Sequence, residues 1–266
     1  MTIYSQAKPA GTPTWIDLAT PDMDAARAFY HAVFGWDYDI SGPEFGGYTT
    51  ARVGKHTATG IGGNTGPDGT TFPVAWGLYF ATDDIEADVA RAVGLGATVW
   101  FPAMTVGEFG RMAACVDPGG AVFSFWQAGT HIGAEIIDEP GSATWYELYA
   151  PDAKQARDFY SALLGATADP MPGGLEYYVL KHGDEMLAGV MQIDPAWGDF
   201  HPDWVTYFSV ANTDETAAAV IKHGGRVLGP IEDTPFGRMA AVTDPFGAQF
   251  KICLLYTSPS PRDRTR

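Results

Sequence analysis

An internal repeat with a spacing of about 130 residues is the feature that most constrains the fold of this chain of 266 residues. Residues 14–22 (TWIDLATPD) return as residues 144–152 (TWYELYAPD), and residues 109–114 (FGRMAA) return as residues 236–241. Each half also has a Phe-Tyr pair early on, and an Asp-Pro pair followed by Gly near its end. The repeat indicates a duplicated domain, and features kept in both halves more often belong to the scaffold.

Composition and charge exclude several classes of protein. With 46% hydrophobic and 18% charged residues, the chain is expected to be globular. A net charge of -16 argues against nucleic-acid or anionic-membrane partners, which bind clustered Lys and Arg. No apolar run approaches the roughly 20 residues of a membrane span, and the start lacks a signal-peptide pattern. A cytoplasmic location is expected, in which Cys115 and Cys253 stay reduced.

Hydrophobic periodicity predicts the same order of elements twice in each half. The first unit reads as a strand over 14–20, a helix from the capping residue Asp22 to Gly35, and short strands near 36–41, 47–53 and 57–62. The second unit reads as a strand over 74–82, a helix over 84–95, and strands near 97–101, 110–116 and 121–126. This pattern predicts an α+β fold with two βαβββ units in each half.

The repeat also sets the expected domain boundaries. Residues 1–129 form the first domain, 130–143 a linker with several Gly and Pro, and 144–254 the second domain. Residues 255–266 switch to Ser, Pro and Arg, and are interpreted as vector-derived sequence or a disordered tail.

The order of these motifs resembles the vicinal oxygen chelate superfamily, which includes glyoxalase I, extradiol dioxygenases and bleomycin resistance proteins. The resemblance rests on four βαβββ units, a Pro-Asp turn before a helix carrying Phe-Tyr and then Gly, and a late Asp-Pro-x-Gly hairpin, and it covers residues 12–254. The chain looks most like tandem two-domain actinobacterial proteins labelled "hydroxylase". The resemblance implies cupped mixed sheets, each with a site on its floor.

The resemblance also implies metal-ligand positions, but this sequence places poor ligands there. The positions usually held by His fall on Trp15 and Trp145, and on Gly77 and Val205, while the usual Glu position falls on Ser124 and Lys251. The fourth-strand position lies near residues 57–59 and 186–188, where only the neighbouring His56 and Glu185 could donate. Because a catalytic metal needs about three protein ligands, no cofactor is expected, with a divalent metal kept as the alternative.

Strand alternation predicts what each cup presents instead. The inward residues on the first strands are Trp15, Asp17 and Ala19 in one half, and Trp145, Glu147 and Tyr149 in the other. The candidate ligand-binding set from all strands is Trp15, Asp17, Tyr79, Ser124, Trp145, Glu147, Tyr149, Tyr207 and Lys251. Aromatic walls with few polar groups suit a flat organic ligand. The alternative is that both tryptophans fill the space left by the metal sphere.

The inward carboxylates and the unmatched polar residues have open interpretations. Asp17 and Glu147 are expected to pair with Arg111 and Arg238 across the sheet, or Glu147 with Lys251, because a buried lone carboxylate is costly. Each carboxylate could instead be a general base with a raised pKa. His56 is a further catalytic candidate, although a lone His at a strand end is more often a surface residue.

Three functions follow from these observations. We favour metal-independent binding of a small planar or aromatic compound, as in bleomycin resistance proteins. The alternative is a glyoxalase-, dioxygenase- or isomerase-type enzyme that uses a metal or the acid-base groups Asp17 and Glu147. A third is an interaction role in which Trp36 and Trp197 are exposed on loops. The expected partner is a small molecule, and the expected assembly is a monomeric pseudo-dimer or a homodimer.

Overall fold

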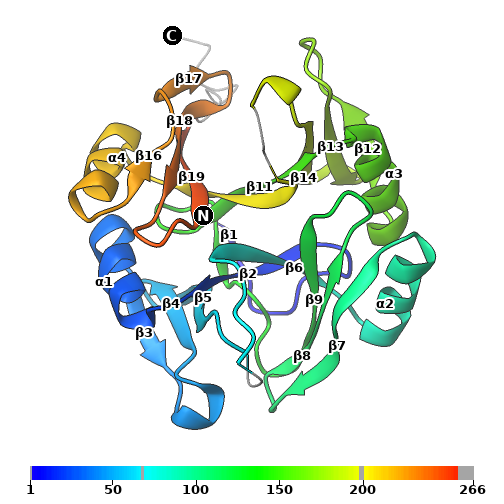
Figure 1. The fold of residues 1–266 in the computed structure, drawn as a ribbon, viewed down its shortest axis with the longest axis horizontal. Coiled ribbons are helices and arrows are strands. Elements are labelled where there is room, and N and C mark those ends of the chain that lie inside the picture. The colour runs from blue at the N-terminus through cyan, green and yellow to red at the C-terminus, as the bar shows by residue number, and fades with distance from the viewer. Residues whose placement is uncertain (1, 67–68, 198–200, 257–266) are drawn as a thin grey trace.

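Two cupped sheets lie back to back in the computed structural model, which describes residues 2–66, 69–197 and 201–256. Their hollow faces point away from each other (Figure 1). Two pairs of contacting helices, α1 with α4 and α2 with α3, lie on either side of the junction between the sheets. This tandem α+β arrangement confirms the predicted fold class. No helix among the described residues is long and apolar enough to cross a membrane.

The first sheet has the strand order β3-β4-β5-β2-β6-β9-β8-β7. Strands β2 and β6, which begin its two βαβββ units, pair antiparallel at its centre. The elements are β2 (Pro13–Thr20), α1 (Met23–Phe34), β3 (Asp37–Ile40), η1 (Pro43–Phe45), β4 (Thr49–Val53), β5 (His56–Gly63), β6 (Ala75–Ala81), α2 (Ile85–Gly94), β7 (Thr98–Val106), β8 (Gly110–Val116) and β9 (Val122–Ala128). Strand β7 therefore runs further than predicted.

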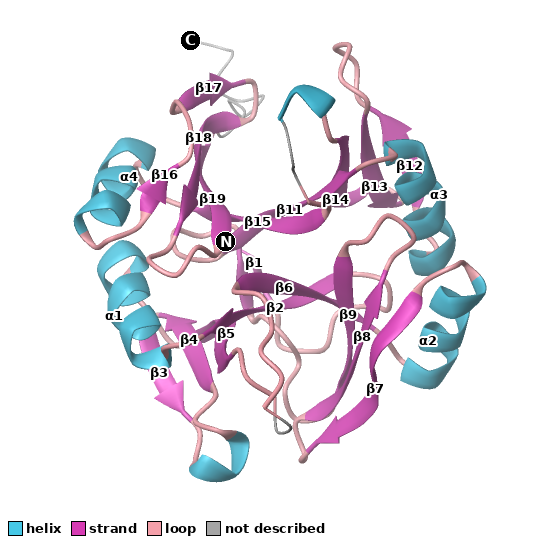
Figure 2. Ribbon diagram, viewed as in Figure 1, coloured by secondary structure: helices cyan, strands magenta, loops and turns pink. Residues whose placement is uncertain are grey.

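The second sheet repeats this topology in the order β12-β13-β14-β11-β15-β19-β18-β16, with β17 also paired to β18. Its elements are β11 (Ala143–Ala150), α3 (Ala153–Leu164), β12 (Thr167–Pro170), β13 (Tyr177–His182), β14 (Glu185–Gln192), η2 (Pro195–Trp197), β15 (Asp203–Ser209), α4 (Thr213–Lys222), β16 (Arg226–Val227), β17 (Glu232–Thr234), β18 (Gly237–Thr243) and β19 (Gln249–Leu255). Figure 2 shows how the helices of both halves cover the outer sides of the two sheets. Of the predicted tail, residues 257–266 lie outside the described part of the chain.

Local signals explain why the two longest helices begin and end where they do. The side chains of Asp22 and Asp152 accept hydrogen bonds from backbone N–H groups of the first turn, as N-caps do. Gly35 and Gly165 end the helices in the left-handed conformation, with φ values of 72° and 68°. These are the positions at which the sequence predicts the caps of the first helix in each half.

The repeated Phe-Tyr and Asp-Pro motifs meet across the two halves. The Tyr30 hydroxyl on α1 donates to Asp244 Oδ2 at 3.2 Å, and the Tyr160 hydroxyl on α3 donates to Asp117 Oδ2 at 2.9 Å. Each of these residues belongs to the opposite half from its partner. The two matched bonds tie the helix of one domain to the hairpin of the other, within one continuous apolar core.

Trp36 corrects the prediction of an exposed loop residue, because its side chain is fully buried. Its ring packs against Tyr30 and Trp76 of its own half and Phe208 of the other half, at centroid distances of 5.3, 6.2 and 5.7 Å. Its Nε1 donates to the Gly141 carbonyl at 2.7 Å. Trp36, which was predicted to lie on a loop, is therefore a core residue at the junction of the two domains. Trp197 is 46% exposed, as predicted.

The predicted linker contains a short strand, β10 (Ile136–Ile137), which pairs with β1 (Thr2–Ile3). Upstream of β10 the linker passes across the hollow face of the first sheet. There Ala134 N–H donates to the Thr14 carbonyl at 2.8 Å, and the His131 ring meets Trp15 edge-on at 4.4 Å. The linker therefore helps to line the first domain's cup.

Candidate functional site

Each domain carries a candidate site on the hollow face of its sheet. We call these the first cup (Trp15, Asp17, Tyr48, Tyr79 and Ser124) and the second cup (Trp145, Glu147, Tyr177, Tyr207 and Lys251). Side chains alternate along β2 and β11, so Ile16 and Leu18 enter the shared core while Trp15 and Asp17 face the cup. The predicted inward faces are therefore the faces observed.

In the first cup, a chain of hydrogen bonds ends at the Asp17 carboxylate. Trp15 Nε1 donates to the Tyr48 hydroxyl at 3.0 Å, and this hydroxyl donates to Asp17 Oδ2 at 3.2 Å. The Tyr79 hydroxyl donates to the same oxygen at 3.1 Å. Burial raises the pKa of Asp17 from 3.8 to about 6, although both tyrosine hydrogen bonds oppose the shift. As a whole residue Asp17 is half-buried, and its carboxylate lies among the side chains of the cup floor.

Glycines make room for this arrangement. In the sheet register Asp17 lies beside Gly60 of β5 and Gly77 of β6. A Cβ on Gly60 would overlap the Tyr48 hydroxyl, and a Cβ on Gly77 would lie 3.2 Å from Asp17 Oδ1. The second cup has the same close approach of a glycine and a tyrosine, because a Cβ on Gly189 would overlap the Tyr177 hydroxyl. These glycines allow a tyrosine to reach over a neighbouring strand to the carboxylate.

The second cup has the same network with one added charge. Trp145 Nε1 donates to the Tyr177 hydroxyl at 3.1 Å, and the Tyr207 hydroxyl donates to Glu147 Oε2. Lys251 Nζ donates to Glu147 Oε2 at 3.2 Å and to the Tyr207 hydroxyl at 2.6 Å. Burial and the nearby Glu147 charge raise the pKa of Tyr207 well above its ordinary value. The tyrosines therefore stay protonated as hydrogen-bond donors.

One position gives the two cup floors a different charge. In the register of the central strands Tyr79 lies beside Ser124, and Tyr207 lies beside Lys251. Lys251 neutralises Glu147 in the second cup, whereas Ser124 leaves Asp17 with hydroxyl partners alone among the contacts of the described residues. The first cup therefore holds a titratable acid, and the second cup holds an ion pair.

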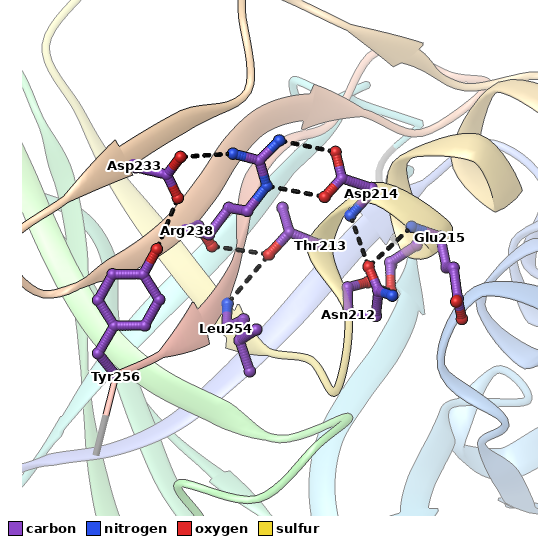
Figure 3. Close-up of polar contacts among 9 residues, drawn as sticks. Asn212, Thr213, Asp214, Glu215, Asp233, Arg238, Leu254 and Tyr256 are labelled. Carbon is purple, nitrogen blue, oxygen red and sulfur yellow. Dashed lines mark hydrogen bonds and ion pairs between the residues drawn. The ribbon is translucent and has the colours of Figure 1, made fainter. Parts of the chain in front are cut away.

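The predicted pairing of the carboxylates with arginines is wrong. Arg111 bonds Glu86 on α2, and Arg238 bonds Asp214 on α4 and Asp233 on β17. Figure 3 shows the Arg238 guanidinium held between its two carboxylates on the outer side of the sheet. The reason is strand parity, since Met112, next to Arg111, faces the cup. The alternative pairing of Glu147 with Lys251 is confirmed.

His56, Tyr149 and Cys115 lie in three different surroundings. His56 begins β5, and its Nδ1 lies 3.9 Å from Oε2 of Glu135 in the linker. Its ionic partner among the described residues is therefore not one of the hydrogen-bonded residues on the cup floor. Tyr149 is buried in the second cup, where its ring lies 6.0 Å from that of Trp197. Cys115 is buried and free, and burial raises the pKa of its thiol to about 11.

Sequence reasoning missed three residues of the cups. Tyr48 directly precedes β4 and Tyr177 begins β13, its counterpart in the second half, so alignment of the repeats would have matched them. His131 lies in the linker, where strand periodicity gives no signal. Its ring meets Trp15 and Trp126, and burial lowers its pKa to about 4, so it is neutral at neutral pH.

The donor set does not fit a resident metal. Among residues 2–66, 69–197 and 201–256, no three His, Cys, Asp or Glu side chains gather as a metal would need. Asp17 already accepts two tyrosine hydroxyls, and Glu147 is bonded to an ammonium. A divalent cation beside Glu147 would also be repelled by Lys251.

Comparison with known proteins agrees with the fold. The family model of the Glyoxalase/Bleomycin resistance protein/Dioxygenase superfamily matches residues 12–125 and 133–252. CFP32 of Mycobacterium tuberculosis, named as a candidate glyoxylase, is 38% identical over 249 residues, which cover 91% of this chain and 94% of that protein. The anthracycline biosynthesis protein DnrV of Streptomyces peucetius is 38% identical over 255 residues, which cover 91% and 92%.

Two solved structures with the same fold are enzymes that have low sequence identity to this chain. The 2,3-dioxygenase LapB of Pseudomonas sp. KL28 aligns with a TM-score of 0.63 at 15% identity, covering 98% of this chain and 96% of that one. The Mn(II)-bound glyoxalase of Novosphingobium aromaticivorans aligns with a TM-score of 0.61 at 13% identity, covering 96% and 90%. The chain belongs to the Glyoxalase/Bleomycin resistance protein/Dioxygenase superfamily.

Proposed function

We propose that this protein binds a planar aromatic small molecule in its cups without a resident metal. The observation that carries the proposal is the network of Trp, Tyr, carboxylate and Tyr that occupies the floor of both cups. Aromatic rings supply contact area to a flat ligand, and a few fixed polar groups orient it. Trp145 is half-buried in the second cup, so its indole remains open to contact.

The relatives support an aromatic ligand in general terms. Two of them, from Streptomyces peucetius and Streptomyces sp. strain C5, are named for anthracycline biosynthesis, and anthracyclines contain flat fused rings. Sequestration of the bleomycin-resistance kind draws no support from these names. The proposal is therefore limited to the shape and chemistry of the ligand.

Titration with alizarin, a flat hydroxyanthraquinone, tests this function. Tryptophan fluorescence is expected to be quenched saturably, and Trp145→Leu is expected to weaken binding about tenfold, which corresponds to about 1.4 kcal/mol. Trp100→Leu is the matched control, because Trp100 is an indole 40% exposed on the edge strand β7. Metal analysis of the same sample is expected to show far less than one divalent ion per chain. Unsaturable quenching, or binding that requires added metal, would reject the proposal.

Asp17 favours a second candidate, an enzyme that transfers a proton without a metal. Its carboxyl combines burial, two hydroxyl partners and a pKa of about 6, which suits a general acid or base near neutral pH. Bound substrate would receive or lose a proton at the Asp17 carboxylate, while Tyr48 and Tyr79 hold that carboxylate in place. Glu147 has a cation beside it and is less suited to this role.

The pH dependence of stability tests whether Asp17 has this property. Because its pKa is higher folded than unfolded, Asp17 binds its proton more tightly in the folded protein. The resulting stabilisation is complete below about pH 4 and is lost as the pH rises through about 6. At about pH 8, Asp17→Asn is therefore expected to be more stable than wild type by about 1–3 kcal/mol, and this gain should vanish near pH 4.

Chemical denaturation across this pH range measures the effect. Asp37→Asn, which changes an exposed carboxylate on β3, is the control and should show no such trend. A gain for Asp17→Asn that does not change with pH would show that Asp17 titrates normally, and the acid-base candidate would be abandoned.

A further inference from the structure

We infer that the second cup binds an aromatic anion, such as a carboxylate or phenolate, and that Lys251 is the residue that selects it. The inference rests on the proposed function and adds the charge of the ligand and the cup that takes it. The two cup floors differ most in charge at one position, which is Ser124 in the first cup and Lys251 in the second.

The ammonium of Lys251 is the outer member of its ion pair. The Lys251 side chain is 18% exposed, whereas that of Glu147 is 5% exposed. Two of the three ammonium hydrogens are used in the bonds to Glu147 and Tyr207. The third can therefore be donated to an acceptor that enters the cup, and an anionic acceptor gives the stronger, charge-assisted bond.

Aromatic groups surround this ammonium. Lys251 Nζ lies 4.6 Å from the ring centroid of Tyr207 and 5.2 Å from that of Tyr149. The half-buried indole of Trp145 belongs to the same floor, with its Nε1 held by Tyr177. A flat anion would meet a positive charge and aromatic faces together, whereas an inorganic anion would gain only the charge.

The first cup is built for the opposite preference. Asp17 carries a negative charge above its pKa of about 6, and Ser124 supplies no compensating cation. An anion entering that cup at neutral pH would be repelled. The chain's charge of -16 also makes a site for an anion depend on a local cation. Lys251 is therefore expected to decide where an aromatic anion binds.

Calorimetric titration with two matched probes tests the inference. Anthracenecarboxylate is the flat anion, and anthracenemethanol is its neutral counterpart of similar shape. We expect the carboxylate to bind about tenfold more tightly than the alcohol at about pH 8. Glu147→Gln removes the competing carboxylate, so it is expected to tighten anion binding severalfold. If Glu147 instead held a cationic ligand group, the same change would leave anion binding no stronger.

A double variant and a control complete the test. Lys251→Met alone leaves Glu147 buried without its cation and could unfold the cup, so Lys251→Met is combined with Glu147→Gln. The double variant is expected to bind both probes with the same, weaker affinity. Lys154→Met is the control for net charge, since Lys154 is 65% exposed on α3 and pairs with Glu176. It should leave the preference for the carboxylate unchanged.

Equal binding of the two probes by wild type, no binding of the carboxylate, or a preference that survives in the double variant would each overturn the inference. The Trp145→Leu variant, titrated with both anthracene probes, separates this failure from failure of the proposed function. Equal binding of the two probes by wild type, weakened for both by Trp145→Leu, would show that the cup binds aromatic compounds without selecting anions. No binding of either probe or of alizarin would show that both are wrong.

Discussion

Replacing Lys251 with methionine alone is expected to destabilise the protein by about 3–5 kcal/mol at about pH 8. Methionine keeps much of the apolar stem of the lysine but removes the ammonium that neutralises Glu147. The Glu147 side chain is 5% exposed, so its charge would stay out of water with only hydroxyl partners. An ion pair of this kind adds little by itself, but breaking it on one side is costly.

Urea denaturation of three variants measures this effect. Glu147→Gln combined with Lys251→Met should recover most of the loss, because no buried charge is then left unpaired. Lys154→Met should stay within about 0.5 kcal/mol of wild type. A single variant as stable as wild type would mean that Glu147 is solvated in solution.

Replacing Trp36 with alanine is expected to cost about 3–5 kcal/mol, the range for removing a large aromatic side chain from a core. The Trp36 indole is fully buried, and its rings contact Tyr30, Trp76 and Phe208. Its removal would also leave the Gly141 carbonyl without the Nε1 donor. Because these contacts come from both halves, the cavity would open at their junction.

Thermal and chemical unfolding measure this loss, with Trp197→Ala as the control. Trp197 is 46% exposed and should cost less than about 1 kcal/mol. Both tryptophans were predicted to be exposed on loops, so equal losses would contradict the burial that separates them. A Trp36→Ala loss below about 1 kcal/mol would place that residue at the surface, as its sequence position suggested.

The repeat made the architecture predictable from the sequence. Matched motifs in the two halves fixed the number of βαβββ units, and Asp22 and Gly35 marked the ends of the first helix. Strand alternation then placed Trp15 and Asp17 on the hollow face. These features depend on residues close in sequence, which is why reasoning from local patterns could reach them.

Contacts that join distant segments were not predictable in the same way. Tyr48 reaches Asp17 only because β4 and β2 both lie beside β5, where Gly60 leaves space. Trp36 is buried by a domain packed on top of it, so its own neighbours in sequence carry no signal. The arginine pairing failed because a matched position in a strand does not give the face of that strand.

The crossed bonds of Tyr30 with Asp244 and of Tyr160 with Asp117 have an evolutionary consequence. Had such halves been separate but identical chains, the same crossed bonds would have joined two copies, and every substitution would have changed both sites at once. Fusion into one polypeptide keeps the crossed bonds between the two halves, and it allows each site to mutate independently of the other. The divergence of Ser124 and Lys251 is a change that an obligate symmetric dimer could not have made.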